Sequence, residues 1–141
     1  MLKHIPSNLS PELVKVLMEM GHGDEIVIAD GNFPSASHAH HLLRLDGQSI
    51  PAVLESILTL LPLDTFVESP VTYMATPKED PEPEIWETYA KVLSETGNGP
   101  ISIDLVDRFE FYDRAKKAYA IVATSETALY ANVILKKGVI A

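Results

Sequence analysis

The sequence predicts an α/β layer fold, because short β-branched runs alternate with amphipathic helical segments along the chain. The clearest runs are apolar at every position, as expected for strands that helices cover on both faces. The segments between the runs repeat apolar residues at helical spacing. A chain of 141 residues has the length of one domain with a substantial buried core. We therefore expect a single α/β domain over residues 1–141.

The first helix is predicted to begin at Ser10-Pro11, where a hydroxyl N-cap precedes proline at the first helical position. Its apolar stripe ends before Gly21, and we expect this glycine to end the helix from the C′ position. The β-branched run 25–29 follows as a buried central strand. That strand ends in a turn cluster over 30–35, which contains glycine, asparagine and proline.

The later elements follow from the same two patterns. Five further runs are predicted strands: 42–45, 71–75, 101–106, 119–123 and 132–135. Three further segments are predicted helices: one that Pro51 opens and Pro62 ends, one around Trp86 that ends at Gly97-Asn98-Gly99, and one over 107–117. The acidic stretch 78–84 contains two prolines and is expected to be an exposed loop.

The composition excludes several classes of function. Acidic residues outnumber basic ones by 20 to 11, and the net charge of −9 would repel a nucleic-acid backbone. The absence of cysteine excludes disulfides, thiol nucleophiles and cysteine metal sites, and it is compatible with a reducing cytoplasm. The sequence has neither a glycine-rich dinucleotide fingerprint nor a P-loop, so no nucleotide cofactor is expected.

Membrane insertion and export are not expected either. No segment reaches the roughly 20 apolar residues that span a bilayer, and the longest candidate, 57–63, is broken by Pro62. The N-terminus has no apolar core of signal-peptide length. The sequence therefore predicts a cytoplasmic protein whose partners are uncharged small molecules or other proteins.

His22 is the first candidate for chemistry, because it lies between two glycines in Gly21-His22-Gly23-Asp24. The glycines leave the imidazole open to a ligand, and the dipole of the preceding helix would favour its charged form. A histidine in such a place is suited to general acid/base catalysis near neutral pH. The alternative is a histidine that caps the helix, with glycines that serve only the turn.

Asp30 is the second candidate, because it follows a predicted buried strand and begins a turn cluster. Ligands of α/β sheets bind outside the carboxyl ends of the strands. The alternative is an Asx turn in which Asp30 stabilises Gly31-Asn32. Asp64 and Met74 are weaker candidates, since Asp64 only follows a helix end and a methionine in a strand is usually part of the core.

Arg108 and Tyr112 are four residues apart, so they share one face of the predicted helix. Guanidinium and hydroxyl groups together suit a polyol, although the same pair would also fit an ordinary surface helix. On the same helix we expect Glu110 and Arg114 to form an i,i+4 ion pair. Tyr130 and Asn132 lie just before the last strand and offer either stacking and amide contacts to a ligand or a simple turn.

Three histidines, His38, His40 and His41, are clustered after the turn. Two of them would share a face of a strand, as metal ligands do, but no third ligand stands at a defined spacing. We therefore expect a solvated loop and no bound metal, and a histidine-based metal enzyme is the alternative.

Five blocks taken together resemble the ribose pyranase / fucose mutarotase family, most closely its L-fucose mutarotase branch. The blocks occur in the family's order: Glu19-Met20-Gly21-His22-Gly23-Asp24-Glu25-Ile26, Ala29-Asp30-Gly31-Asn32-Phe33-Pro34, Leu60-Leu61-Pro62-Leu63-Asp64, the stretch 108–118 and the stretch 130–138. The resemblance implies a three-layer α/β/α fold around a mixed sheet of about six strands. It also implies interconversion of the anomers of a free monosaccharide without any cofactor.

The resemblance further implies roles for individual residues. His22 would be the general acid/base, and Asp64 and Tyr112 would share the catalytic work. The sugar would be bound by Asp30, Met74, Arg108, Tyr130 and Asn132. The expected substrate is L-fucose, with D-ribose or D-galactose as alternatives, and the expected assembly is a homo-oligomer, decameric or smaller, with sites near the subunit contacts. The alternative functions are a D-ribose pyranase and a sugar-binding module without turnover.

Overall fold

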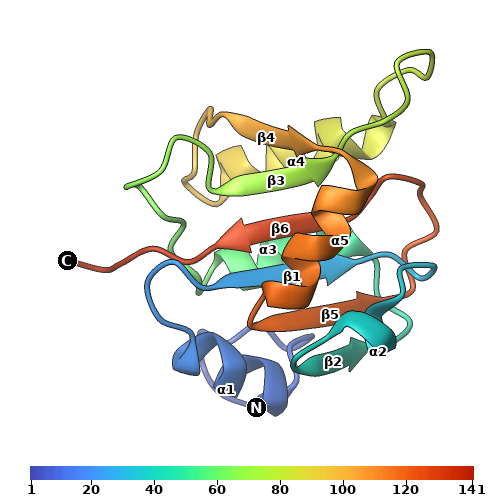
Figure 1. Cartoon of the computed structure of the whole chain (residues 1–141). Coiled ribbons are helices and arrows are strands. Elements are labelled where there is room, and N and C mark those ends of the chain that lie inside the picture. The colour runs from blue at the N-terminus through green and yellow to red at the C-terminus, as the bar shows by residue number, and fades with distance from the viewer.

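Six strands form one mixed sheet in the computed structural model, which describes all 141 residues (Figure 1). The strands are β1 (Glu25–Ala29), β2 (Leu42–Leu45), β3 (Val71–Met74), β4 (Ile103–Val106), β5 (Ala120–Thr124) and β6 (Val133–Lys136). Their order across the sheet is β2-β5-β1-β6-β3-β4. All pairs are parallel except those of β6, which runs antiparallel to both β1 and β3.

Five helices cover the sheet and make the three predicted layers. They are α1 (Pro11–Glu19), α2 (Ser35–His38), α3 (Ile50–Leu58), α4 (Glu84–Glu95) and α5 (Arg108–Lys117). In Figure 1, α5 crosses one face of the sheet while α3 and α4 lie behind the other. The buried side chains of α1, α3 and α4 contribute to one core of 26 residues. The core beneath α5 has only 10 buried residues.

The strand pattern explains why β1 is apolar at successive positions. Ile26 and Ile28 point into the larger core, whereas Val27 and Ala29 point into the smaller one beneath α5. Alternate residues of a strand face opposite sides, so a strand with helices on both faces must be apolar throughout. The predicted central position of this strand is thus confirmed.

The start of α1 is confirmed, and Gly21 occupies the predicted C′ position, although without the left-handed conformation typical of a glycine there. The Ser10 hydroxyl accepts a hydrogen bond from the Leu13 N–H at 3.2 Å, as an N-cap should. The helix ends at Glu19, and Met20 caps it in an extended conformation. The left-handed backbone lies at Gly23, with φ of 87°, and not at Gly21. The glycines therefore shape the loop that follows the helix.

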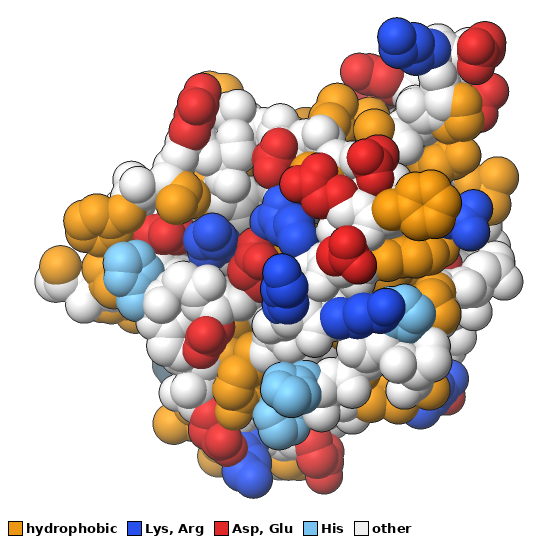
Figure 2. All heavy atoms as spheres, viewed as in Figure 1, with side chains coloured by type: hydrophobic (Ala, Val, Ile, Leu, Met, Phe, Trp, Pro, Cys, Tyr) orange, Lys and Arg blue, Asp and Glu red, His pale blue; other side chains and the backbone are white.

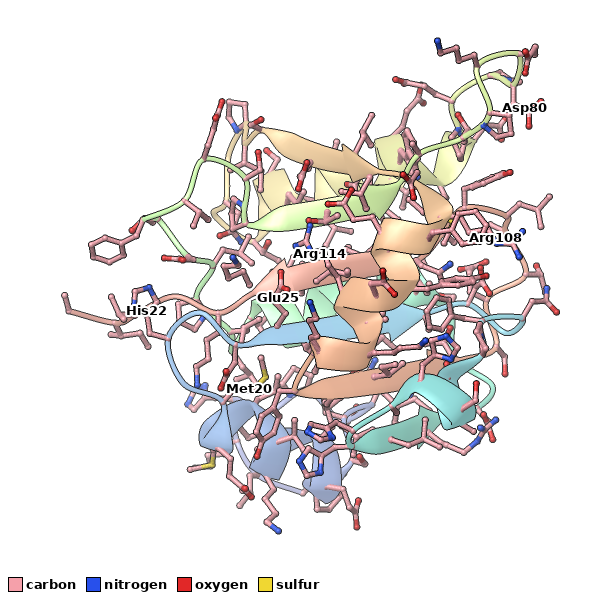
Figure 3. All side chains as sticks on the ribbon, viewed as in Figure 1. Met20, His22, Glu25, Asp80, Arg108 and Arg114 are labelled. Atoms are coloured by element: carbon pink, nitrogen blue, oxygen red, sulfur yellow. The ribbon has the colours of Figure 1, made fainter.

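The predicted ion pair between Glu110 and Arg114 is wrong. The Arg114 guanidinium instead donates to Glu25 at 2.6 Å and to Asp104 at 3.1 Å. Figure 3 shows Arg114 of α5 and Glu25 at the start of β1 pointing toward each other over the sheet. A tertiary contact with two carboxylates replaces the single local pair, and it fixes α5 to two strands.

Neither sign of charge dominates the face that Figure 2 shows. No helix is long and apolar enough to cross a membrane. On the face with α5, basic side chains are interspersed among acidic ones (Figure 2). The acidic loop that contains Asp80 projects away from the sheet, as predicted for an exposed segment (Figure 3).

Strand direction divides the functional loops between two edges of the sheet. The five parallel strands all end at one edge, and the antiparallel β6 begins at that edge. Loops that precede β1 and β3, together with the end of β6, gather at the opposite edge. The two edges hold different predicted site residues.

Candidate active site

The predicted site residues fall into two groups at opposite edges of the sheet. We call the group of His22 and Asp64 the histidine edge, because both precede strands that run away from it. The other group is the aspartate edge, and it consists of Asp30, Met74, Arg108, Tyr112, Tyr130 and Asn132. The five residues of β1 separate His22 from Asp30, which places the edges roughly 17 Å apart at about 3.3 Å per residue. Figure 3 shows His22 and Arg108 on opposite sides of the molecule.

At the histidine edge, an exposed imidazole is anchored by a buried carboxylate. His22 Nε2 lies 3.0 Å from Asp64 Oδ1, and the side chains are 44% and 3% exposed. The Phe66 N–H also donates to Asp64 Oδ1, at 3.0 Å. This backbone hydrogen bond, and then the His22 ring, hold the pKa of Asp64 below its ordinary value. Asp64 is therefore an ionised acceptor at neutral pH.

The anchoring carboxylate fixes which nitrogen of His22 is available for chemistry. An ionised carboxylate can only accept a hydrogen bond, so the proton between the two groups belongs to Nε2. Nδ1 makes no hydrogen bond within the chain. The Phe66 ring packs on the imidazole with 5.2 Å between centroids and leaves most of its own surface exposed. His22 thus offers a free basic nitrogen to a ligand.

The end of β6 runs between the His22 loop and the Asp64 loop and is hydrogen-bonded to both. On one side, the Gly23 N–H donates to the Lys137 carbonyl at 2.8 Å, and the Lys137 N–H donates to the Asp24 carbonyl at 2.9 Å. On the other side, the Asp64 N–H donates to the Lys136 carbonyl at 3.0 Å, and the Gly138 N–H donates to Pro62. These backbone bonds set the distance between the two side chains.

The dipole of α1 was expected to act on His22, but Lys137 already compensates the negative end of this helix. Its ammonium donates to the carbonyls of Leu17 and Met20, at 2.7 and 2.5 Å, and so caps the end of α1. The helix ends three residues before His22, and a lysine cation already compensates its C-terminal carbonyls. The interaction with Asp64 is what orients the imidazole.

At the aspartate edge, Asp30 is buried and tied to Asn132. The Asp30 N–H donates to Asn132 Oδ1 at 2.8 Å, and Asp30 Oδ1 accepts the Asn32 N–H at 2.9 Å. The Asx turn, which was the alternative to a functional role for Asp30, is therefore present. Burial raises the pKa of Asp30, against the lowering effect of the backbone N–H groups. Asp30 also lines a hollow of about 300 Å³.

Aromatic and cationic side chains lie beside Asp30. The Arg108 guanidinium stands 5.5 Å from the centre of the Tyr112 ring, so the two share a helix face as predicted. Phe33 packs edge-on against Tyr112 at 5.3 Å. Tyr130 has a φ of 54°, a left-handed conformation that is uncommon for a residue with a side chain. This edge thus combines hydrogen-bonding groups with ring faces, as sugar recognition requires.

The remaining candidates contribute less. Met74 is 5% exposed and packs in the core beneath α5 at the end of β3. His38 ends the short helix α2, which was not predicted, and hydrogen-bonds Ser37 at 2.9 Å. No three histidine, aspartate or glutamate side chains are arranged to hold a metal ion.

Two contacts at the histidine edge could not be inferred from the spacing of residues. Phe66 was not singled out, although an aromatic residue two positions after Asp64 is a visible feature of the sequence. Lys137 belongs to the stretch 130–138, for which the sequence predicts no contact of this lysine, and its bonds to Leu17 and Met20 span more than 100 residues.

The whole chain is similar to proteins of one family. Residues 3–140 match the model of the RbsD / FucU transport protein family. The fucose mutarotase of Homo sapiens is 50% identical over 147 residues, which cover 99% of this chain and 95% of that protein. The structure of the fucose mutarotase from Streptococcus pneumoniae in complex with L-fucose is 56% identical, with a TM-score of 0.95 over 99% of this chain and 100% of that one. Bacillus subtilis RbsD complexed with D-ribose is 27% identical, with a TM-score of 0.77 over the full length of both chains.

Gly138 is predicted to be required for the close approach of β6 to the Asp64 loop. A Cβ at this position would lie 2.8 Å from the Asp64 Cα, and its neighbours are backbone atoms that cannot rotate away. Gly138→Ala should therefore lower the free energy of unfolding by about 1–3 kcal/mol in urea denaturation. Gly99→Ala is the control, because a Cβ there meets nothing within 4 Å. Equal stabilities of the two variants would refute the close-packing claim.

Asp30 is predicted to reduce stability at neutral pH. Its pKa is higher in the folded chain than in the unfolded one, so the ionised carboxylate opposes folding at pH 7, and this penalty disappears as the pH falls through 3.8. Asp30→Asn should therefore have a higher Tm than the wild type at pH 7, with the difference shrinking toward pH 4. Asp113→Asn, at an exposed position without a hydrogen bond, is the control. A Tm lower than that of the wild type at pH 7 would contradict this.

Proposed function

The chain belongs to the RbsD / FucU transport protein family, and on that premise we propose that it is an L-fucose mutarotase. Such an enzyme is an isomerase that interconverts the α and β anomers of the free sugar. The reaction moves protons and changes no oxidation state, so its chemistry requires no cofactor. The fucose mutarotase identity of relatives that are about half identical over the full length supports the choice of sugar.

The observation that carries the proposed chemistry is the His22–Asp64 pair. Opening a sugar ring requires one proton to leave the anomeric hydroxyl and another to reach the ring oxygen. The free Nδ1 of His22 accepts or returns a proton, while Asp64, 3.0 Å from Nε2, stabilises the imidazolium that forms. Asp64 thus acts through the His22 ring. Reclosure of the ring on the other face of the carbonyl reverses the transfers and gives the other anomer.

The aspartate edge supports binding of a neutral polyol. The carboxylate of Asp30 and the amide group of Asn132 match sugar hydroxyls, and Arg108 adds fixed donors. The Tyr112 ring and its neighbour Phe33 offer an apolar surface for the C–H face of the sugar. We assign the Tyr112 hydroxyl to proton exchange with the second sugar oxygen.

A complete site requires a second copy of the chain, because one chain separates the two edges by about 17 Å. We propose that the histidine edge of one copy docks on the aspartate edge of the next. Both edges carry exposed apolar side chains that such a contact would cover: Phe66 at the histidine edge, and Phe109 and Leu129 at the aspartate edge. Since two different surfaces meet, the contact is heterologous, and repeating it generates a ring where the rotation between copies closes.

A D-ribose pyranase is the second candidate, since a relative complexed with D-ribose has the same fold. Its identity of 27% is about half that of the fucose mutarotase structure, so the comparison favours fucose. A sugar-binding module without turnover would need the aspartate edge but not His22. One experiment distinguishes all three.

Saturation-transfer NMR on equilibrated L-fucose should show anomer exchange well above the buffer rate when the wild-type protein is present. His22→Ala should return the rate toward that of buffer, a loss of about 10²–10⁴-fold, because the general acid/base is removed. His40→Ala, at an exposed histidine that belongs to neither group, should retain the wild-type rate.

Each contrary result has a distinct meaning. Faster exchange of D-ribose than of L-fucose would replace the proposed activity by that of a pyranase. Binding of L-fucose without any acceleration would leave a sugar-binding module. A His22→Ala variant that is as active as the wild type would remove the assigned mechanism.

A further inference from the structure

Two side chains of α4 donate hydrogen bonds to the backbone of the segment that precedes β6. The Trp86 indole N–H donates to the Tyr130 carbonyl at 3.0 Å, and the Tyr89 hydroxyl donates to the Ala131 carbonyl at 2.7 Å. Tyr89 is fully buried. Two successive carbonyls of one segment are therefore held by one helix.

The segment needs such support because Tyr130 is in a left-handed conformation. Its φ is 54°, and apart from His4 no other residue with a side chain has a positive φ. This conformation costs energy and persists only where the surrounding contacts enforce it. The indole bond fixes the peptide plane that follows Tyr130, which is the plane that a relaxation of φ would turn.

The support extends to Asp30 through the neighbouring residue Asn132. Ala131 is fully buried, and Asn132 next to it accepts the Asp30 N–H at 2.8 Å. A shift of the segment would therefore displace the Tyr130 ring, the Asn132 amide and the Asp30 backbone together. Neither Trp86 nor Tyr89 belongs to the groups assigned to sugar contact above.

We propose that Trp86 and Tyr89 are positioning residues, which hold Tyr130 and Asn132 in the geometry that binds the sugar. This inference rests on the proposed function, since it takes Tyr130 and Asn132 as sugar ligands. The hydrogen bonds from Trp86 and Tyr89 fix the positions of the binding groups before any reaction, and they do not take part in proton transfer at His22. Their loss should therefore weaken sugar binding and leave the chemical step nearly unchanged.

Tyr73 provides a matched control for a role in packing alone. Its ring lies 5.1 Å from Trp86 and 5.7 Å from Tyr89, so it belongs to the same aromatic cluster. Its hydroxyl makes no hydrogen bond in the structure, and burial raises its pKa to about 12. Tyr73→Phe thus removes a hydroxyl from the cluster without removing a bond to the segment.

The test compares Trp86→Phe, Tyr89→Phe and Tyr73→Phe with the wild type in L-fucose exchange followed by NMR. Loss of either donor should raise KM about 3- to 10-fold, the effect of one hydrogen bond, with kcat within about twofold. Tyr73→Phe should keep both values. If the two donor variants have the KM of Tyr73→Phe, or if kcat falls while KM is unchanged, the positioning role is refuted while the mutarotase assignment stands.

Hydrogen exchange provides a second measurement that does not depend on catalysis. The backbone amides of residues 131 and 132 should exchange faster in Trp86→Phe and Tyr89→Phe than in Tyr73→Phe, because the segment is less firmly held. This comparison decides the positioning claim even if the wild type fails to accelerate fucose exchange. Equal exchange in all three variants would overturn it. Circular dichroism confirms that each variant is folded before either measurement.

Discussion

The antiparallel strand β6 is the element on which both halves of the site depend. The segment before it carries Tyr130 and Asn132, and Asn132 binds the Asp30 backbone at 2.8 Å. Its last residue, Lys136, and the two residues that follow it are hydrogen-bonded to the His22 loop on one side and to the Asp64 loop on the other. Because β6 lies between β1 and β3 and runs against both, a single strand aligns two distant sets of functional groups.

The same topology holds the two proposed sets apart, so that in our proposal neither forms a complete site within one chain. The histidine edge has a basic nitrogen but no sugar-binding group beside it. The aspartate edge has the proposed sugar-binding groups but no general base. Each edge therefore supplies half of the proposed mutarotase site. The proposed contact between unlike edges of successive copies would join the halves and cover exposed side chains such as Phe66 and Leu129. Catalysis would then depend on assembly, since each contact between copies would create one site.

The sequence contains most of the fold but not the tertiary contacts. The helix start at Ser10 and the central strand 25–29 were predictable because capping and hydrophobic patterning are local. The pairing of Arg114 was not, since Glu25 and Asp104 become available only through folding and replace the local partner Glu110. The separation of His22 from Asp30 could be inferred, because the two residues flank one extended strand. The bonds from α4 to the Tyr130 segment could not, since more than 40 residues intervene.

A complementation experiment tests the shared site most directly. His22→Ala lacks the base but retains an intact aspartate edge, and Asp30→Asn has the reverse defect. Each variant alone should exchange L-fucose near the buffer rate. After the two are refolded together in equal amounts, about a quarter of the contacts between copies should join two intact edges and restore about a quarter of the wild-type rate. If the mixed assembly stays as inactive as its components, the site is not shared between copies and the account is wrong.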